Sequence, residues 1–387
     1  MHKEIITEQA PIKLWLNDIE EGALNQAKNL ANLPFTFKHV AIMPDAHEGY
    51  GMPIGGVLAT REVIIPNAVG VDIGCGMCAV RTNLRVTNKK QLNVIMQLTR
   101  SMIPLGAKHH KKAQKDNLMP VRTELPPIAQ REYTSARHQL GTLGGGNHFI
   151  EVQKGSDGFI WLMIHSGSRN IGKKVADHYN RMAVALNEKW KSPVPRNWQL
   201  AYLPLDDEAA HTYIEEMQYC VDFAFANRKL MMQRFKEAFS EVFHGRIQFG
   251  EMINIAHNYA AKEEHFQKKV WVHRKGATSA LAGQTGIIPG SQGTQSYIVT
   301  GLGNPESFMS CSHGAGRVMG RRQAQRELDL MTEIGKLENK GIIHAVHTQR
   351  DLDEASGAYK DINLVMRNQQ DLVTIMVELE PLAVIKG

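Results

Sequence analysis

The strongest sign of chemistry in this chain is a histidine set among small residues and followed by an arginine. His313 lies in the run Ser-Cys-Ser-His-Gly-Ala-Gly-Arg, residues 310–317. Glycines such as Gly314 and Gly316 let the backbone approach an anion closely, and Arg317 can bind phosphate oxygens in bidentate fashion. The pattern therefore predicts a histidine nucleophile that meets a phosphate.

Two residues of metal-ligand type lie close together around Gly74. Asp72 and Cys75 are three residues apart, and a turn at the glycine can aim both side chains at one point. A carboxylate and a thiolate together suit a divalent cation, and a thiolate can bridge two cations. Taken alone, the pair fits a buried cysteine beside a turn aspartate equally well.

Three histidines could complete such a site. His148 follows three consecutive glycines, His165 ends an apolar run, and His257 lies in the apolar stretch 253–259. Each could also be an ordinary buried histidine. Together with Asp72 and Cys75, however, the three imidazoles are enough to hold two divalent ions. Ligand softness favours zinc or another late metal at a thiolate, so it does not by itself select manganese.

Three well-known sequence signatures, those of phosphate-binding loops, zinc proteases and lysine-adenylating ligases, are absent. The chain has no GxxxxGK[ST] loop, no HExxH pair and no KxDG-like lysine motif. Nucleotidyl transfer would therefore need another nucleophile, and His313 is the available one. Asn147 and Glu151, beside His148, and Ser291 in the turn-rich run 286–293 could line a nucleotide pocket.

Composition places the chain among ordinary globular proteins. Of its 387 residues, 43% are hydrophobic and 22% are charged, and the net charge of +6 favours a polyanionic partner only weakly. We find no apolar run long enough for a membrane span and no signal-peptide pattern at the N-terminus, so we expect a cytoplasmic protein. Cys75 and Cys78 form a CxxC, but without a second CxxC a structural zinc knuckle is disfavoured.

The elements that must position these residues are strands and one long helical region. Periodic apolar residues predict a helix over 206–239 within a helical stretch at about 173–245, which we interpret as a packing scaffold. A run of lysines and histidines at 108–115 is expected to be a solvated loop, although it could contact phosphate. Strands are expected at 37–43, on both sides of a tight turn within 63–82, and at 158–164, 269–273, 296–300 and 371–386, the last with a break at Pro381. A loop at 44–49 follows the first strand, and a loop and a helix beginning near Gly172 follow the strand at 158–164.

These motifs resemble the RtcB family of RNA-splicing ligases over nearly the whole chain. The resemblance is carried by MPDAHEGYGMPIGG (43–56), NAVGVDIGCGM (67–77), LGTLGGGNHFIEV (140–152), HSGSRNIG (165–172), AHNYA (256–260), GIIPGSQG (286–293), SCSHGAGRVMGR (310–321), AYKDI (358–362) and the terminal Lys386-Gly387. It implies an α+β fold of the family's own type, with mixed β-sheets surrounded by helices. It also implies one large catalytic unit spanning 1–387.

The resemblance further implies GTP as co-substrate and two Mn²⁺ ions. By the matching motifs, His313 would form a histidine–GMP intermediate and Cys75 would bridge the ions. Asp72 and His257 would complete one ion's shell, and His148 and His165 the other's. Guanylate contacts would come from Asn147, His148, Glu151, Ser291, His313, Gly314, Gly316, Tyr359 and Lys386, and RNA phosphates would meet Arg169, Arg317 and Arg321.

The implied reaction joins an RNA 3′-phosphate, or a 2′,3′-cyclic phosphate after hydrolysis, to a 5′-hydroxyl. The expected partner is RNA with broken ends, such as tRNA halves or damaged RNA. An activating protein factor is kept open, and a monomer is expected. The stretch 336–352 and the pair Ser356-Gly357 depart from the family pattern, which suggests a looser loop and an RNA-repair paralogue rather than a tRNA-splicing enzyme.

Two other functions are compatible with parts of the sequence. A metal-dependent phosphodiesterase or phosphatase would need the ligands but not His313 as nucleophile. A non-enzymatic RNA-binding or repair scaffold would need neither, and the complete set of Cys and His ligands argues against it.

Overall fold

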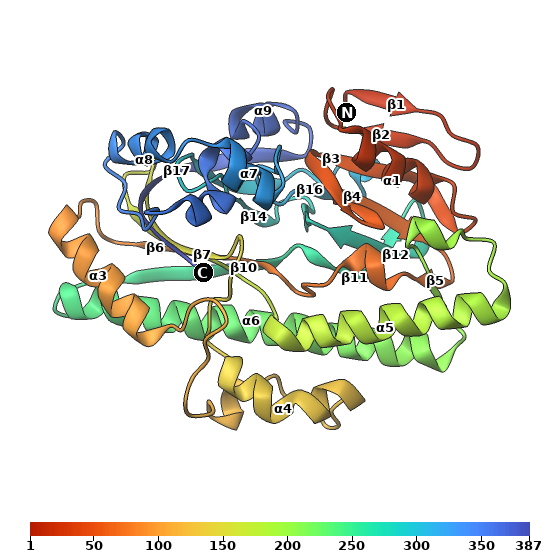
Figure 1. Ribbon diagram of the computed structural model, residues 1–387, viewed down its shortest axis with the longest axis horizontal. Coiled ribbons are helices and arrows are strands. Elements are labelled where there is room, and N and C mark those ends of the chain that lie inside the picture. Colours follow the sequence, from red (N-terminus) through yellow and green to blue (C-terminus); the bar gives the residue numbers. More distant parts are fainter.

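The computed structural model describes residues 1–387 and combines several sheets with helices, which confirms the predicted α+β class. Two larger sheets form the centre, and long helices lie along one side of them (Figure 1). The strands of the six-stranded sheet are, in order, β1 (Lys3–Ile5), β2 (Ile12–Leu14), β3 (Thr36–Tyr50), β4 (Met52–Thr60), β12 (Lys268–Lys275) and β11 (Asn258–His265). Only β2 and β3 pair in parallel.

A seven-stranded antiparallel sheet carries much of the predicted chemistry at its strand ends. Its order is β10 (Phe249–Ala256), β6 (Gly76–Thr82), β8 (Ile160–Ser166), β7 (Phe149–Gly155), β17 (Val373–Lys386), β15 (Ser296–Gly301) and β14 (Thr285–Ile288). Two small sheets pair β13 (Ala277–Ser279) with β16 (Ser310–Ser312), and β5 (Val63–Ile64) with β9 (Leu203–Pro204).

The longest helix, α6 (Glu208–Val242), confirms the helix predicted at 206–239. It begins where the Asp207 side chain accepts a hydrogen bond from the Ala209 N–H at 2.8 Å. Its buried face includes Phe235 and Phe239, which join the hydrophobic core beneath β6 and β8. Burying each ring contributes roughly 2–3 kcal/mol, so sheet and helix stabilise one another.

The other helices surround this core. In Figure 1, α5 runs beside α6 and α4 lies below them. No helix has both the length and the apolar character that a membrane crossing requires. The remaining helices are α1 (Glu21–Ala31), α2 (Pro66–Val69), α3 (Lys89–Met102), α4 (Pro127–Gln139), α5 (Arg169–Trp190), α7 (Arg321–Glu327), α8 (Leu330–Glu338) and α9 (Ile362–Arg367).

The expected helical stretch at 173–245 is interrupted. It comprises α5 and α6, separated by a connection in which Lys191 takes a left-handed backbone conformation and Pro193 follows. Proline lacks the N–H that a continuing helix needs, which accounts for the break. Helix α5 also begins at Arg169, earlier than the predicted start near Gly172.

Three other local predictions need correction. The expected loop at 44–49 is part of β3, whose register shifts on both sides of His47. Between the strands at 63–82 lies the short helix α2 as well as a turn. Pro381 does not break β17, because it lies at an irregularity of the pairing with β7, where a missing N–H is tolerated.

Candidate functional site

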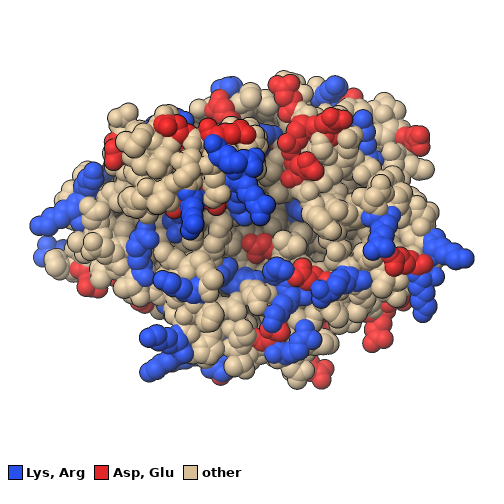
Figure 2. Space-filling view, viewed as in Figure 1, with Lys and Arg blue, Asp and Glu red and all other residues tan.

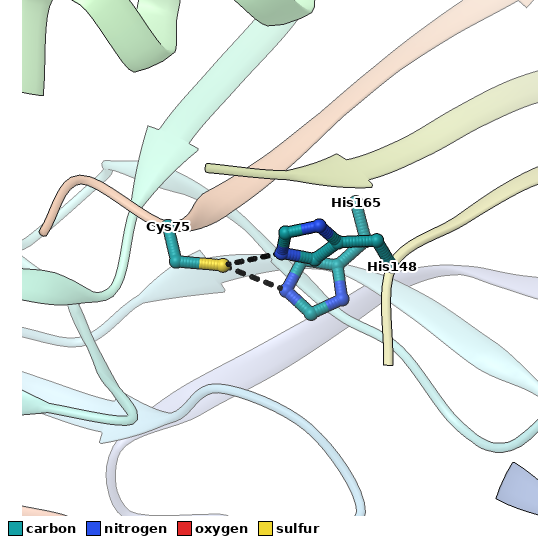
Figure 3. Close-up of side chains that lie close together, drawn as sticks. All are labelled: Cys75, His148 and His165. Carbon is teal, nitrogen blue, oxygen red and sulfur yellow. Dashed lines mark hydrogen bonds between the residues drawn. The ribbon is translucent and has the colours of Figure 1, made fainter. Parts of the chain in front are cut away.

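A cluster of metal-ligand side chains lies at the strand ends of the seven-stranded sheet. Cys75 directly precedes β6, His148 directly precedes β7, and His165 lies near the end of β8. The Cys75 Sγ atom is 3.4 Å from His148 Nε2 and 3.3 Å from His165 Nε2 (Figure 3). All three side chains are buried, and their ligand atoms lie within 4.8 Å of one another.

The two remaining predicted ligands extend this cluster at opposite ends. Asp72 Oδ2 lies 3.1 Å from His148 Nε2. His257, in the tight connection between β10 and β11, places its Nε2 3.4 Å from His165 Nε2. The structure therefore brings all five predicted ligands together, in an order in which Asp72 neighbours His148 and His257 neighbours His165.

The hydrogen bonds around the cluster leave lone pairs facing its centre. His148 Nδ1 donates to the Leu143 carbonyl at 2.9 Å, and His165 Nδ1 donates to the Asn147 carbonyl at 3.1 Å. A neutral imidazole that donates through Nδ1 carries a lone pair on Nε2. These Nε2 atoms face the sulfur of Cys75 and a carboxylate oxygen, which is an arrangement that a cation stabilises. The donor set therefore fits a metal site.

Electrostatics supports neutral imidazoles at His165 and His257. Burial lowers the pKa of His165 and of His257 well below the ordinary histidine value, and neighbouring histidines lower both further. Burial and then the Asp72 carboxylate raise the pKa of the Cys75 thiol well above its usual value. A bound cation would reverse this last effect, because metal coordination favours the thiolate.

Two buried polar residues of α6 hold the loops that carry the ligands. Asn227 accepts the N–H of Gly141 at 2.7 Å and donates to the Gly167 carbonyl at 3.1 Å. Arg228 donates to the carbonyls of Gly74 and Ser166, both at 2.9 Å. Neither residue was predicted from the sequence, because each interrupts the apolar pattern of the helix without forming a motif of its own. Helix α6 is thus more than a packing scaffold.

His313 lies beside the metal-ligand cluster, with its ring centroid 4.8 Å from that of His257. Its Nδ1 lies 2.6 Å from Oδ2 of the fully buried Asp45, which also accepts the backbone N–H of His313 at 3.1 Å. Gly316 has a positive φ and lies against the Asp45 carbonyl, where a Cβ would come within 2.1 Å. Burial opposes ionisation of Asp45, but the neighbouring His313 keeps the pKa of the carboxyl below its ordinary value.

Asp45 and His47 were not among the site residues predicted from the sequence, although both lie in a motif that carried the resemblance. His47 also lines the pocket described next, and its Nδ1 donates to the Asp45 carbonyl at 3.0 Å. Burial lowers the pKa of His47 to about 4, so the ring is neutral. An aspartate 268 positions from the histidine it contacts gives no local signal.

A pocket opens next to His313 and the ligand cluster. Ten residues proposed from the sequence line it: Asn147, His165, Ser291, His313, Gly314, Gly316, Arg317, Arg321, Tyr359 and Lys386. Glu151 and His148 do not line it. Glu151 is buried nearby, and burial raises its pKa to about 8 while the Lys386 ammonium opposes this shift.

A second buried carboxylate joins the cations of the pocket wall. Glu354 Oε1 lies 2.9 Å from Arg321 Nε and 3.1 Å from Arg317 Nη1. Glu354 Oε2 accepts a hydrogen bond from the Tyr359 hydroxyl and lies 3.9 Å from Lys386 Nζ. Glu354 was not predicted from the sequence. It lies between the stretch 336–352 and the pair Ser356-Gly357, which depart from the expected pattern.

Arg169, the third arginine proposed to meet RNA, lies outside the pocket. Its Nε donates to Thr142 Oγ1 at 3.1 Å and its Nη2 to the Gly106 carbonyl at 3.2 Å. Gly144, at a positive φ, leaves the space that this guanidinium fills. Arg169 therefore ties the glycine-rich loop before His148 to the segment that follows α3.

Comparison with known proteins agrees with this geometry. The family model for tRNA-splicing ligase RtcB matches residues 26–124 and 120–387. The chain belongs to the RtcB family. It is 39% identical to an RNA-splicing ligase RtcB of Escherichia coli K12 over an alignment covering 100% of both chains. It is 33% identical to a tRNA-splicing ligase RtcB of Nanoarchaeum equitans, with 97% of this chain and 95% of the relative covered. It is 31% identical to a tRNA-splicing ligase RtcB of Thermococcus kodakarensis, with 95% of this chain and 92% of the relative covered.

The segment that departs from the RtcB pattern is packed, which corrects the expectation of a looser loop. The Gly357 N–H donates to Glu333 Oε2 at 3.2 Å, and Ser356 Oγ lies 3.1 Å from Ser291 Oγ. Lys340 Nζ donates to the Gly293 carbonyl at 2.7 Å. The departure from the RtcB pattern thus lies directly behind the pocket loop that carries Ser291.

Proposed function

We propose that this protein is a GTP- and Mn²⁺-dependent RNA ligase that joins 3′-phosphate or 2′,3′-cyclic phosphate ends to 5′-hydroxyl ends. The observation that carries the proposal is the position of His313. Its ring is held by Asp45 and lies between a cluster of five metal-ligand residues and a pocket rich in cationic and polar groups. Membership in a family whose relatives are named RNA-splicing ligases supports the same reaction.

The first step is guanylate transfer to His313. With Nδ1 donating to Asp45, the Nε2 lone pair is free to attack the α-phosphorus of GTP. A bond forms between Nε2 and phosphorus, and the bond from phosphorus to the bridging oxygen breaks, releasing pyrophosphate. The imidazole gains positive charge in the phosphoramidate, and the Asp45 carboxylate stabilises that charge.

Two further transfers complete ligation. An oxygen of the RNA 3′-phosphate attacks the phosphorus of the histidine–GMP, and the Nε2–phosphorus bond breaks. The 5′-hydroxyl oxygen then bonds to the phosphorus of the activated 3′ end, its proton passes to solvent, and the bond from that phosphorus to GMP breaks, releasing GMP. Cyclic ends enter after hydrolysis to the 3′-phosphate. Binding both ends in one site converts a meeting of two strands into a local reaction.

Asp72, Cys75, His148, His165 and His257 would hold two Mn²⁺ ions, with Cys75 between them. Divalent cations at such a site neutralise charge that develops on the attacking and leaving oxygens. The contacts favour a grouping different from the one expected from the sequence. We propose that Asp72 and His148 serve one ion, and that His165 and His257 serve the other, because these pairs lie 3.1 Å and 3.4 Å apart.

The pocket lining supports guanylate binding by Asn147, Ser291, Tyr359 and Lys386, with Glu151 behind them. Arg317 and Arg321 would meet phosphates at the same wall. Because the contributing residues span Asp45 to Lys386, we propose that the chain acts as one catalytic unit. Its substrates would be tRNA halves or damaged RNA.

The proposal is tested with α-labelled GTP and Mn²⁺. Wild-type protein should take up label that survives denaturation and is lost in acid, whereas His313→Ala should take up none. A wild-type protein that never takes up label under these conditions would contradict the proposal. Release of terminal phosphate, or opening of a cyclic phosphate, with metal but without GTP would instead support a metal-dependent phosphatase or phosphodiesterase.

A further inference from the structure

The segment between α3 and α4 presents a group of lysines that have no acidic partner. In this basic loop, residues 106–115, the lysines Lys108, Lys111, Lys112 and Lys115 are exposed. The nearby carboxylate of Asp116 is already engaged, since it lies 3.3 Å from Arg137 Nη1 and accepts a hydrogen bond from the Tyr133 hydroxyl. The loop therefore projects uncompensated positive charge.

The basic loop is fixed to the glycine-rich loop that carries His148. The Gly106 N–H donates to the Gly144 carbonyl at 2.9 Å, and Arg169 Nη2 donates to the Gly106 carbonyl at 3.2 Å. Farther along, the His110 N–H donates to the His138 carbonyl at 2.9 Å. These bonds anchor the start of the basic loop to the glycine-rich loop before His148, and anchor His110 to the C-terminal end of α4.

Several other cations, on α5 and at the pocket wall, are already paired with carboxylates. On α5, Lys173 forms an ion pair with Asp177, and Lys174 lies 2.5 Å from Glu132. At the pocket wall, Glu354 binds two arginines. Figure 2 shows basic side chains on both sides of a central hollow, and a further group at the lower edge, where Figure 1 places the segment between α3 and α4. The basic loop, by contrast, carries four exposed lysines that form no ion pair.

The geometry of phosphoryl transfer indicates which RNA strand would reach this loop. In an in-line displacement, the attacking and leaving oxygens lie on opposite sides of phosphorus. The leaving GMP would occupy the pocket lined by His313, Tyr359 and Lys386, and no residue of the basic loop lines that pocket. The attacking strand must therefore enter from the other side.

We propose that the basic loop binds the phosphates of the RNA strand that supplies the 5′-hydroxyl. This inference rests on the proposed ligase function and assigns a surface to one of its two substrates. From Lys108 to Lys115 an extended chain spans at most about 25 Å, so the loop can follow several phosphates of a single strand. A dinucleotide would be too short to contact most of these lysines.

The test compares wild type with the triple variant Lys108→Ser, Lys111→Ser, Lys112→Ser in the full-length protein. Sealing is measured at saturating GTP and 3′-phosphate strand while a 5′-hydroxyl strand of about ten nucleotides, or a dinucleotide, is varied. We expect the KM of the long strand to rise about tenfold or more at low salt, and that of the dinucleotide to stay unchanged. The slope of log KM against log salt concentration should decrease by about 2, because each lost phosphate contact on a single strand removes roughly 0.7 from that slope.

A matched control removes equal charge elsewhere. Lys3, Lys268 and Lys269 are exposed on the six-stranded sheet, and their triple serine variant should behave as wild type. Both triple variants should still label His313 with GMP and should still transfer GMP to the 3′-phosphate strand.

Two outcomes would overturn the inference while leaving the ligase function intact. The first is a long-strand KM in the loop variant that equals the KM of wild type. The second is a rise in the KM of the 3′-phosphate strand, measured at saturating 5′-hydroxyl strand, with no rise in the KM of the 5′-hydroxyl strand. That result would place the other substrate on this loop. A wild-type protein that takes up no GMP and seals no RNA would remove both the inference and the proposed function.

Discussion

Asp45 and His313 form a short contact across 268 positions of sequence, with 2.6 Å between Asp45 Oδ2 and His313 Nδ1. The same carboxylate oxygen accepts the backbone N–H groups of His313 and Gly314, at 3.1 and 3.3 Å. The contact therefore fixes both the ring and the backbone of His313. It also selects the tautomer in which Nε2 has a free lone pair.

Replacing Asp45 with asparagine should slow guanylate transfer strongly. The amide can offer an N–H to His313 Nδ1, which favours the tautomer protonated at Nε2, and it no longer stabilises positive charge on the ring. We expect a loss on the order of 10²- to 10⁴-fold in the rate of labelling from α-labelled GTP. The metal content of Asp45→Asn should match wild type. Labelling at the wild-type rate would show that Asp45 does not set the tautomer.

The proposed grouping of ligands predicts how metal content changes on mutation. Asp72→Ala should lose one of two bound Mn²⁺ ions, and His257→Ala should lose the other, so that the double variant binds none tightly. If Asp72 and His257 served the same ion, as expected from the sequence, the double variant would retain one ion. Equilibrium dialysis with elemental analysis distinguishes the two cases.

Thermal unfolding gives an independent measure of the same site. A ligand present at a hundred times its Kd stabilises the folded state by about 2.7 kcal/mol, so chelation should lower the Tm of wild type. The double variant Asp72→Ala, His257→Ala should show a smaller change on chelation. An equal change in both proteins would place the stabilising ion elsewhere.

Asn227 on α6 should be a positioning residue for the glycine-rich loop. Replacing it with alanine would leave the N–H groups of Gly141 and Thr142 without their acceptor. An unsatisfied buried group costs about 1–3 kcal/mol, so the free energy of unfolding should fall by at least about 1 kcal/mol. Mn²⁺ affinity should fall as well. Asn180→Ala, a change at a half-buried amide of α5, serves as the control.

The sequence predicted the five candidate metal ligands and His313 from local motifs. Most of these residues stand beside glycines, which allow tight turns, and His257 was included as a further imidazole in an apolar stretch. The sequence also predicted the long helix and most central strands from periodicity. Asp45, Asn227 and Glu354 were missed because their roles depend on partners far away in the chain. The packing of 336–357 could not be predicted either, because Gly357 has a local preference for flexibility that its contact with Glu333 overrides.

Glu354 should make stability depend on pH. Burial opposes its ionisation, but the Lys386 ammonium and the Arg317 guanidinium hold the pKa of this carboxyl below its ordinary value of 4.5. A carboxyl whose pKa is lower in the folded state stabilises the fold at pH values above 4.5. That contribution is lost as the pH falls from 4.5 through the folded-state pKa. Wild type should therefore lose stability relative to Glu354→Gln in that range.

The measurement is the free energy of unfolding by denaturant for wild type and Glu354→Gln from pH 7 to pH 3. Near neutral pH, glutamine keeps the shape but removes the charge that faces two arginines, so the variant should be less stable by roughly 1.5–3 kcal/mol. The difference should be constant down to about pH 5 and should shrink below it. A difference that stays constant to pH 3 would mean that the carboxylate charge of Glu354 does not hold Arg317, Arg321 and Lys386 in place, and that the glutamate acts through its shape alone.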